Sequence, residues 1–271
     1  MTRYPRRMGQ STRGKTALNR LRRVDNYLIL ALAECLYGTP LVVDLGYGAY
    51  PWTTLEMAAR LGRVNPAVRC LGIEIDPARV SAAQPYATSN VQFQLGGFNI
   101  SDFTGVGAVS VIRAYNVLRQ YQEAEVGAAL NTMARALQTG GVLIEGTSNP
   151  TGGIAVFDVY RQNKGSLQHE ALVFATNLNA RIADIPSDFQ TILPKRLIHH
   201  MREESLDNFF AAWRRAYQIA RALCIERSPI HVWCTAADWL HLEGGYPIDM
   251  RRRLLRRGFL PLHTPLLPPP L

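Results

Sequence analysis

The sequence predicts an α/β fold with a mostly parallel sheet, and three observations carry this prediction. Leu41–Leu45 is an apolar run of strand length that ends abruptly at Gly46 and Gly48. Pro51 then suits the first turn of a helix, and Thr53–Leu61 continues it. Further apolar runs of strand length alternate with helical stretches along the next hundred residues. Such alternation is typical of strands and helices that build a parallel sheet.

The remaining elements follow from the same patterns in chain order. We expect seven strands, at Leu41–Leu45, Arg69–Glu74, Val91–Leu95, Gly107–Ile112, Val142–Gly146, Ala155–Tyr160 and Ala171–Leu178. Helices are expected over 17–37, 53–61, 123–137 and 206–223. Asp76 and Pro77 predict a capped helix start after the second strand. Little room remains for a helix between the fifth and sixth strands.

The chain of 271 residues divides into three predicted parts. Residues 1–40 form a basic N-terminal arm and helix, and the first 16 of them are expected to be mobile. Residues 41–180 form the sheet domain. Residues 181–271 form a mainly helical extension that packs on the core and ends in an extended, proline-rich tail from Leu260 onward.

Composition narrows the class of protein. The 47% apolar share is that of an ordinary globular chain, and the four cysteines form no CxxC pair, which is typical of reduced thiols in a cytoplasmic protein. Leu28–Leu36 is too short to span a bilayer, and Glu34 interrupts it, so we expect neither an export signal nor a membrane span. His231, Cys234 and His241 lack the paired spacing of a zinc site, and no metal is predicted.

Two basic clusters account for much of the net charge of +9. They are Arg3, Arg6, Arg7, Arg13, Lys15, Arg20, Arg22 and Arg23 near the start, and Arg251, Arg252, Arg253, Arg256 and Arg257 near the end. Such clusters either contact nucleic acid phosphates or form a solvated face, and the sequence leaves both open. Gly9–Thr16 matches the phosphate-loop pattern G-x-x-x-x-G-K-[ST]. No buried strand precedes it, so we reject a phosphate-loop NTPase.

Two acids are predicted at the carboxyl edge of the sheet. Asp44 stands at the end of the first strand and Glu74 at the end of the second, where a carboxylate can bind ribose hydroxyls. A dinucleotide fingerprint requires a third glycine where Pro51 stands, and Asp44 would repel its phosphates. S-adenosylmethionine carries a positive sulfonium and no phosphate, so the acid favours it.

Val-Asp-Leu-Gly-Tyr-Gly (residues 43–48) resembles the first motif of class I S-adenosylmethionine-dependent methyltransferases, and Glu74 matches the second. The resemblance covers 41–146 and implies a Rossmann-like seven-stranded sheet. It implies a cofactor site formed by Asp44, Gly46, Tyr47, Gly48, Glu74, Ile75, Gly97, Phe98 and Arg113. Gly97 stands where the family usually has Asp, which leaves the adenine contact to the backbone, Phe98 or Asn99.

The acceptor side is less defined. The resemblance makes Arg113 and Asn116 the catalytic candidates, although Asn116 also suits a helix cap. Arg20, Arg23, Tyr115 and Asn116 are substrate-side candidates, and residues 19–25 form either a lid or a packing helix. No cysteine lies nearby for covalent catalysis.

The sequence therefore predicts methyl transfer from S-adenosylmethionine to an O or N acceptor by in-line displacement. The acceptor is left open between RNA, held by the basic arm, and an anionic small molecule. A protein that binds S-adenosylmethionine without turnover is the remaining alternative.

Overall fold

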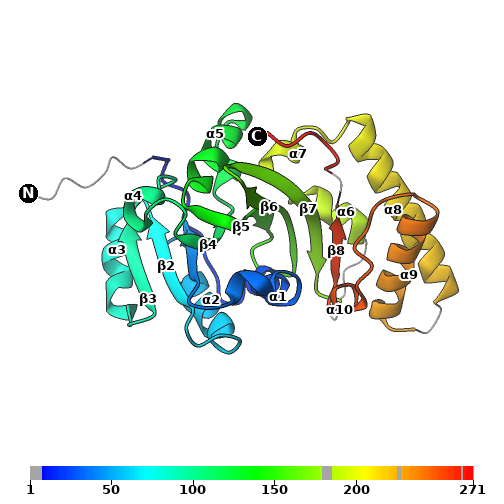
Figure 1. Cartoon of the computed structure of the whole chain (residues 1–271). Helices are drawn as coiled ribbons and strands as arrows, with labels where there is room; N and C mark the ends of the chain where they lie inside the picture. Colours follow the sequence, from blue (N-terminus) through cyan, green and yellow to red (C-terminus); the bar gives the residue numbers. More distant parts are fainter. Residues whose placement is uncertain (1–7, 179–184, 225–226, 264, 271) are drawn as a thin grey trace, which may run out of the picture.

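The computed structural model describes residues 8–178, 185–224, 227–263 and 265–270 (Figure 1). Its centre is one sheet with the strand order β3-β2-β1-β4-β5-β6-β7-β8. The strands are β1 (Leu41–Leu45), β2 (Arg69–Glu74), β3 (Val91–Leu95), β4 (Val109–Tyr115), β5 (Leu137–Ser148), β6 (Ile154–Asn163), β7 (Ser166–Thr176) and β8 (Phe259–Leu262). Strands β1 to β5 pair in parallel, and β5 to β8 pair antiparallel. The α/β class and the mostly parallel sheet are confirmed.

The strand number differs from the prediction, because the described sheet has eight strands and not seven. The eighth strand lies where an extended tail was expected from Leu260. All four residues of β8 are buried, so no alternation of polar and apolar residues marks it as a strand. Pro261 is tolerated because β8 is the last strand in the sheet order, where one side of the strand needs no ladder partner.

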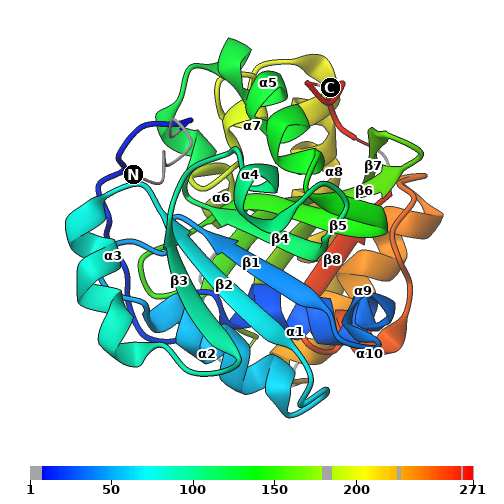
Figure 2. The ribbon, with the colours of Figure 1, turned by 60° about the vertical axis from the view of Figure 1, so that its left-hand side comes forward.

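Helices cover both faces of the sheet (Figures 1 and 2). The α-helices are α1 (Arg22–Ala31), α2 (Trp52–Gly62), α3 (Pro77–Ala83), α4 (Ser101–Thr104), α5 (Glu123–Ala134), α6 (Ile185–Gln190), α7 (Lys195–Ile198), α8 (Glu204–Leu223), α9 (Pro229–Leu242) and α10 (Arg252–Leu255). Short 3-10 helices are η1 (Ala33–Leu36), η2 (Gln84–Tyr86) and η3 (Leu118–Gln120). The Asp76 carboxylate accepts hydrogen bonds from the Ala78 and Arg79 amides, which confirms the predicted cap of α3.

Two predicted helices are shorter in the structure. The helix expected over 17–37 begins only at Arg22, after Asn19 takes a left-handed φ of 61°, and α1 ends at Ala31. The helix expected over 123–137 ends at Ala134, and the glycines at 140 and 141 lie inside β5 rather than in a helix cap.

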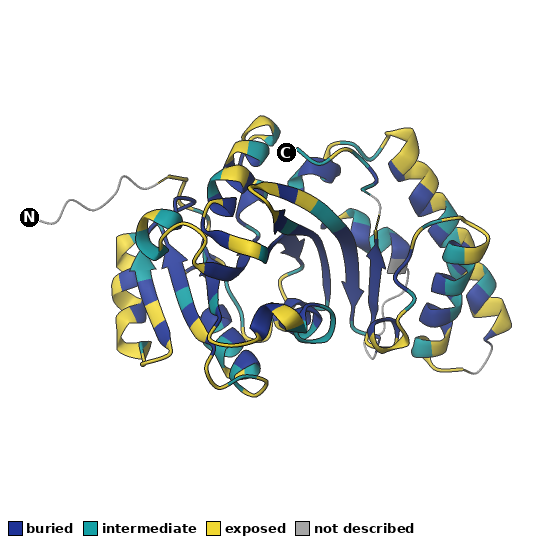
Figure 3. Cartoon of the chain, in the orientation of Figure 1, coloured by how far each residue is buried: buried dark blue, intermediate teal, exposed yellow. Residues whose placement is uncertain are grey.

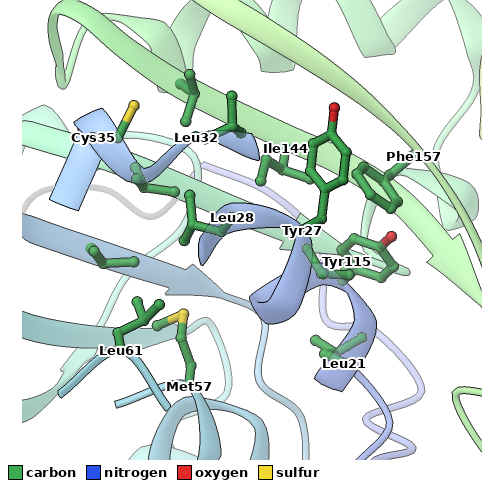
Figure 4. Packing of buried hydrophobic residues seen from close by; sticks show 14 of the residues in the cluster. Leu21, Tyr27, Leu28, Leu32, Cys35, Met57, Leu61, Tyr115, Ile144 and Phe157 are labelled. Carbon is green, nitrogen blue, oxygen red and sulfur yellow. The ribbon is translucent and has the colours of Figure 1, made fainter. Parts of the chain in front are cut away.

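Three buried apolar clusters join the layers, and Figure 3 shows that the interior strands are buried on both faces. On one face, α1 and α2 pack on the sheet, and Tyr27 contacts Phe157 edge to face with ring centroids 5.2 Å apart (Figure 4). On the other face, α5 packs on the parallel strands. Helices α6, α8 and α9 pack on β6–β8, where Phe209, Phe210 and Trp213 are buried as predicted. The division into three parts stays a prediction, and β8 returns the C-terminal part to the central sheet.

Candidate cofactor and substrate site

The glycine turn after β1 contacts the acid at the end of β2. Gly46 and Gly48 have φ values of 74° and 90°, which favour glycine. The Gly46 amide donates to the Ile73 carbonyl oxygen at 2.7 Å, and the Gly48 amide donates to Glu74 Oε2 at 3.0 Å. Parallel pairing of β1 with β2 brings these groups to one edge of the sheet. The structure therefore places the two predicted motifs together.

Asp44 is neutralised by a neighbouring strand. Residues 44 and 113 are partners in the β1–β4 ladder, and Arg113 Nε donates to Asp44 Oδ1 at 3.0 Å. Arg113 also pairs with Asp25 and donates to the Thr53 carbonyl oxygen. Burial lowers the pKa of Arg113, but Asp44 and Asp25 outweigh it and raise this pKa.

This pairing changes the predicted roles of both residues. Arg113 is 2% exposed and does not line the cavity described below, so we assign it to a buried ion cluster with Asp44 and Asp25 and not to catalysis or cofactor contact. Asp44 lines the cavity, but its carboxylate is already paired with Arg113 and accepts bonds from Thr53 and Thr54. The negative charge that favoured a sulfonium at this edge is therefore balanced by a protein cation.

A cavity of about 500 Å³ opens beside the glycine turn. Of the predicted site residues, those that line it are Arg20, Asp44, Gly46, Tyr47, Gly48, Tyr115 and Asn116. Arg23 does not line the cavity, and its Nε donates to the Gly153 carbonyl oxygen at 3.1 Å. Burial and, to a lesser extent, the positive charge of Arg22 lower the pKa of Arg23 to about 10.

Asn116 is held in place by its backbone conformation and by its hydrogen bonds. Its φ of 58° lies in the left-handed region, directly after β4. Its side-chain Oδ1 accepts from the Ser148 amide at 3.1 Å, and its backbone amide donates to the Gly146 carbonyl oxygen at 2.8 Å. Non-glycine residues with a left-handed φ are uncommon in proteins, and those that occur are often found at functional sites. The side chain bridges the ends of β4 and β5, so Asn116 is not a simple helix cap.

The N-terminal arm, defined as residues 8–16, lies across the predicted adenosine side. The Phe98 amide, the backbone donor expected to contact adenine, donates to the Met8 carbonyl oxygen at 2.8 Å. Met8 N donates to Asn99 Oδ1 at 3.2 Å. Gln10 N donates to the Tyr121 hydroxyl.

The arm leaves little room beside Glu74, Ile75, Gly97 and Phe98. The cavity lined by these residues holds only about 20 Å³. Glu74 is 2% exposed, accepts from the amides of Ile75 and Gly48, and lies 3.5 Å from Arg79 Nη1. Adenosine at this position therefore requires residues 8–12 to leave it. The arm was expected to be mobile, and in the structure its residues 8–12 fill part of the predicted cofactor site.

The arm does not form a phosphate loop. Residues 9–16 carry neither helix nor strand, and α1 begins only at Arg22. Gly14 is fixed by its carbonyl oxygen, which accepts from the Ala49 amide at 2.9 Å. Lys15 and Thr16 nevertheless line the large cavity. The strand that such a loop needs would fall on residues 1–7, outside the described part of the chain.

A second buried ion cluster lies behind Tyr115, and sequence analysis missed it. It consists of Glu145, Asp158, His169 and Arg196. Burial, then Asp158, raises the pKa of Glu145 to about 8. Burial alone would raise the pKa of Asp158, but Arg196 and His169 lower it to about 2. Arg196 Nε donates to Asp158 Oδ2 at 2.7 Å. Neither Glu145 Oε1 nor the Tyr115 hydroxyl has a hydrogen-bond partner among the described residues.

Other cavity residues were also missed, namely Arg119, Gln120, Ser148 and Asn149. Their positions in the sequence could have indicated them, because they lie at or just after the carboxyl ends of β4 and β5. His231, Cys234 and His241 were rejected as zinc ligands on their spacing, and the described residues hold no group of three metal-binding side chains. All four cysteines are free and buried. In the second basic cluster, Arg251 pairs with Asp249, and Arg252 with Asp238.

No helix among the described residues is long and apolar enough to cross a membrane. No protein family model matches the chain, and no curated protein matches it either.

Several solved structures are similar to part of the chain. The CMeT domain of the citrinin polyketide synthase is 18% identical over 42% of this chain and 30% of that domain, with a TM-score of 0.36. StiE O-MT is 19% identical over 46% of this chain and 42% of that chain, with a TM-score of 0.35. The plantazolicin methyltransferase BamL, solved with a triazolic desmethylPZN analog and SAH, is 15% identical over 47% of this chain and 46% of that chain, with a TM-score of 0.38.

The chain matches less than half of the length of each of these three solved structures. Such likenesses decide neither the activity nor the acceptor. The chain's own topology is more informative, because strands in the order 3-2-1-4-5 run in parallel with helices on both faces. The described residues therefore have the Rossmann-like α/β fold that the sequence resemblance implies.

Proposed function

We propose that this protein binds S-adenosylmethionine at the carboxyl edge of β1 and β2 and transfers its methyl group to an O or N acceptor. The observation that carries the proposal is the contact between the Gly48 amide and the Glu74 carboxylate, beside a cavity of about 500 Å³. Glycine turn and acid stand at the tips of adjacent parallel strands, where open α/β sheets bind ligands. The cavity has the size of a small-molecule site.

The chain's residues supply position rather than a catalytic pair. Glu74 would hold the ribose hydroxyls. The glycines at 46 and 48 would let the protein backbone of the turn come close to the ligand. Asn116 would orient the acceptor at the end of β4. When bound, the cofactor would supply an electrophilic methyl group: the acceptor lone pair would bond to the methyl carbon, the carbon–sulfur electron pair would stay on sulfur as a neutral thioether, and the acceptor proton would leave to water. Alignment in an enclosed cavity supplies much of the acceleration of such a reaction.

Calorimetry with S-adenosylmethionine and with ATP tests the cofactor. It is run on the full chain and on a chain that lacks residues 1–12, so that the arm does not mask the site. We expect binding of S-adenosylmethionine and none of ATP. Glu74→Gln should weaken S-adenosylmethionine binding by about 10- to 100-fold, the worth of a hydrogen bond to a charged group.

Glu243→Gln is the matched control, because Glu243 is exposed in the described chain. It should bind as the parent does. Binding of ATP alone, or equal affinity in Glu74→Gln and the parent, would overturn the proposal. Incubation with labelled cofactor and a cell extract, before and after ribonuclease, then tests turnover and separates RNA from other acceptors.

A further inference from the structure

Four cationic side chains line the large cavity: Arg13, Lys15, Arg20 and Arg119. Asp44 is the one acid among the described residues that line it, and Arg113 already balances its charge. The walls of the cavity are therefore strongly positive. A positive cavity of limited volume concentrates anions.

Among the described residues, the two half-buried arginines of this cavity, Arg20 and Arg119, have only neutral hydrogen-bond partners. Arg20 Nε donates to Ser148 Oγ at 3.3 Å, and its Nη1 donates to the Lys15 carbonyl oxygen at 2.6 Å. Arg119 Nη2 donates to the Thr191 carbonyl oxygen at 3.0 Å. Burial lowers the pKa of both groups.

The buried arginines Arg113 and Arg196 show the contrast, because each is paired with an aspartate at bonding distance. A guanidinium withdrawn from water without a carboxylate retains donors for an anionic ligand. Asn116, Ser148 and Asn149 line the same cavity and offer neutral groups for the rest of that ligand.

We propose that the methyl acceptor is a small molecule that carries a carboxylate or phosphate group, bound in the large cavity by Arg20 and Arg119. The identity of the ligand as acceptor rests on the proposed function. The anion site itself depends on Arg20 and Arg119. Neither belongs to residues 8–12, the segment of the arm that must move before the cofactor can bind. A volume of about 500 Å³ suits a small molecule, which favours it over a nucleic acid chain.

Calorimetry on the full chain at low salt tests the site, with pyrophosphate and malonate as the two probes. At least one probe should bind, and the stronger one identifies the phosphate or the carboxylate as the recognised group. Arg20→Gln and Arg119→Gln should each weaken its binding by about 10- to 100-fold. Arg20→Lys keeps the charge but loses the paired donors of the guanidinium, so it should bind more tightly than Arg20→Gln and less tightly than the parent.

Arg253→Gln is the control, because Arg253 is exposed and its loss removes the same charge away from the cavity. Absence of binding by both probes, or equal weakening in the control, would overturn the proposal. A twelve-nucleotide RNA that binds more tightly than both probes and depends on Arg20 would also overturn it. Glu74→Gln should keep anion binding, so failure of the cofactor site is distinguishable from failure of the anion site.

Discussion

The substitution Gly97→Ala should increase the affinity for S-adenosylmethionine by opening the adenosine side of the site. A Cβ at position 97 would collide with the Met8 carbonyl oxygen, and the three nearest atoms to it all belong to Met8. The φ of Gly97 is not in the left-handed region, so alanine fits the local backbone. The methyl group therefore acts on the arm and not on the turn that carries it.

The size of the effect follows from the contact that is lost. The hydrogen bond from the Phe98 amide to the Met8 carbonyl oxygen cannot coexist with the new Cβ. Loss of such a bond shifts the balance between closed and open arm by about 0.5–1.5 kcal/mol. Apparent affinity scales with the open fraction, so the gain is about 2- to 10-fold while the closed arm predominates. Deletion of residues 1–12 removes the competitor entirely and should give at least this gain.

Calorimetry with S-adenosylmethionine on the parent, Gly97→Ala and the deletion measures the effect. Gly62→Ala is the control, because a Cβ there meets no atom within 4 Å. It should bind as the parent does. Equal or weaker binding in both Gly97→Ala and the deletion would refute the reasoning, because the arm would then close over the cofactor instead of competing with it.

Three further predictions concern buried and strained groups. Asn116→Ala and Asn116→Gly both lose the hydrogen bond from the Ser148 amide, but only alanine is strained at the left-handed φ. Asn116→Ala should therefore be about 1–2 kcal/mol less stable than Asn116→Gly in urea unfolding. Both variants should lose methyl transfer, and full transfer in Asn116→Gly would contradict the role of the side chain. Arg113→Gln leaves Asp44 buried without its cation and leaves Asp25 with Arg60 as its remaining cation, so it should cost about 3–5 kcal/mol in urea unfolding. A cost below 1 kcal/mol, taken as about one ordinary hydrogen bond, would argue against the cluster of Arg113, Asp44 and Asp25. Glu145 has a folded pKa raised to about 8, so its contribution to stability is full below its unfolded pKa and is lost as the pH rises through 8. Between pH 4.5 and about 8, the free energy of unfolding of the parent should fall by up to about 1.4 kcal/mol per pH unit relative to Glu145→Gln. Parallel curves of unfolding free energy against pH for the two proteins would contradict this.

Local patterns predicted much of the fold and one half of the site. The glycine turn at 46–48, the acid at Glu74 and the cap at Asp76 are each set by a few adjacent residues, and each lies where the sequence indicated. The pairing of Asp44 with Arg113 depends on which strands become neighbours, and 69 residues separate the two in sequence. The position of the arm could not be predicted from the sequence either. A polar, basic segment without hydrophobic periodicity does not indicate which part of the fold its backbone contacts.

The balance of charge links the cofactor site to the acceptor site. An unpaired Asp44 carboxylate would balance the positive charge of a sulfonium. In the structure, that carboxylate already forms an ion pair with Arg113. The large cavity adds Arg20 and Arg119 to the same side. A sulfonium bound within a few ångströms of these guanidiniums would be repelled by them, because like charges repel each other in a partly buried site. An anionic acceptor between the arginines and the sulfonium reverses the sign of that interaction. Under the proposed function, the arrangement therefore favours an acceptor that brings its own negative charge.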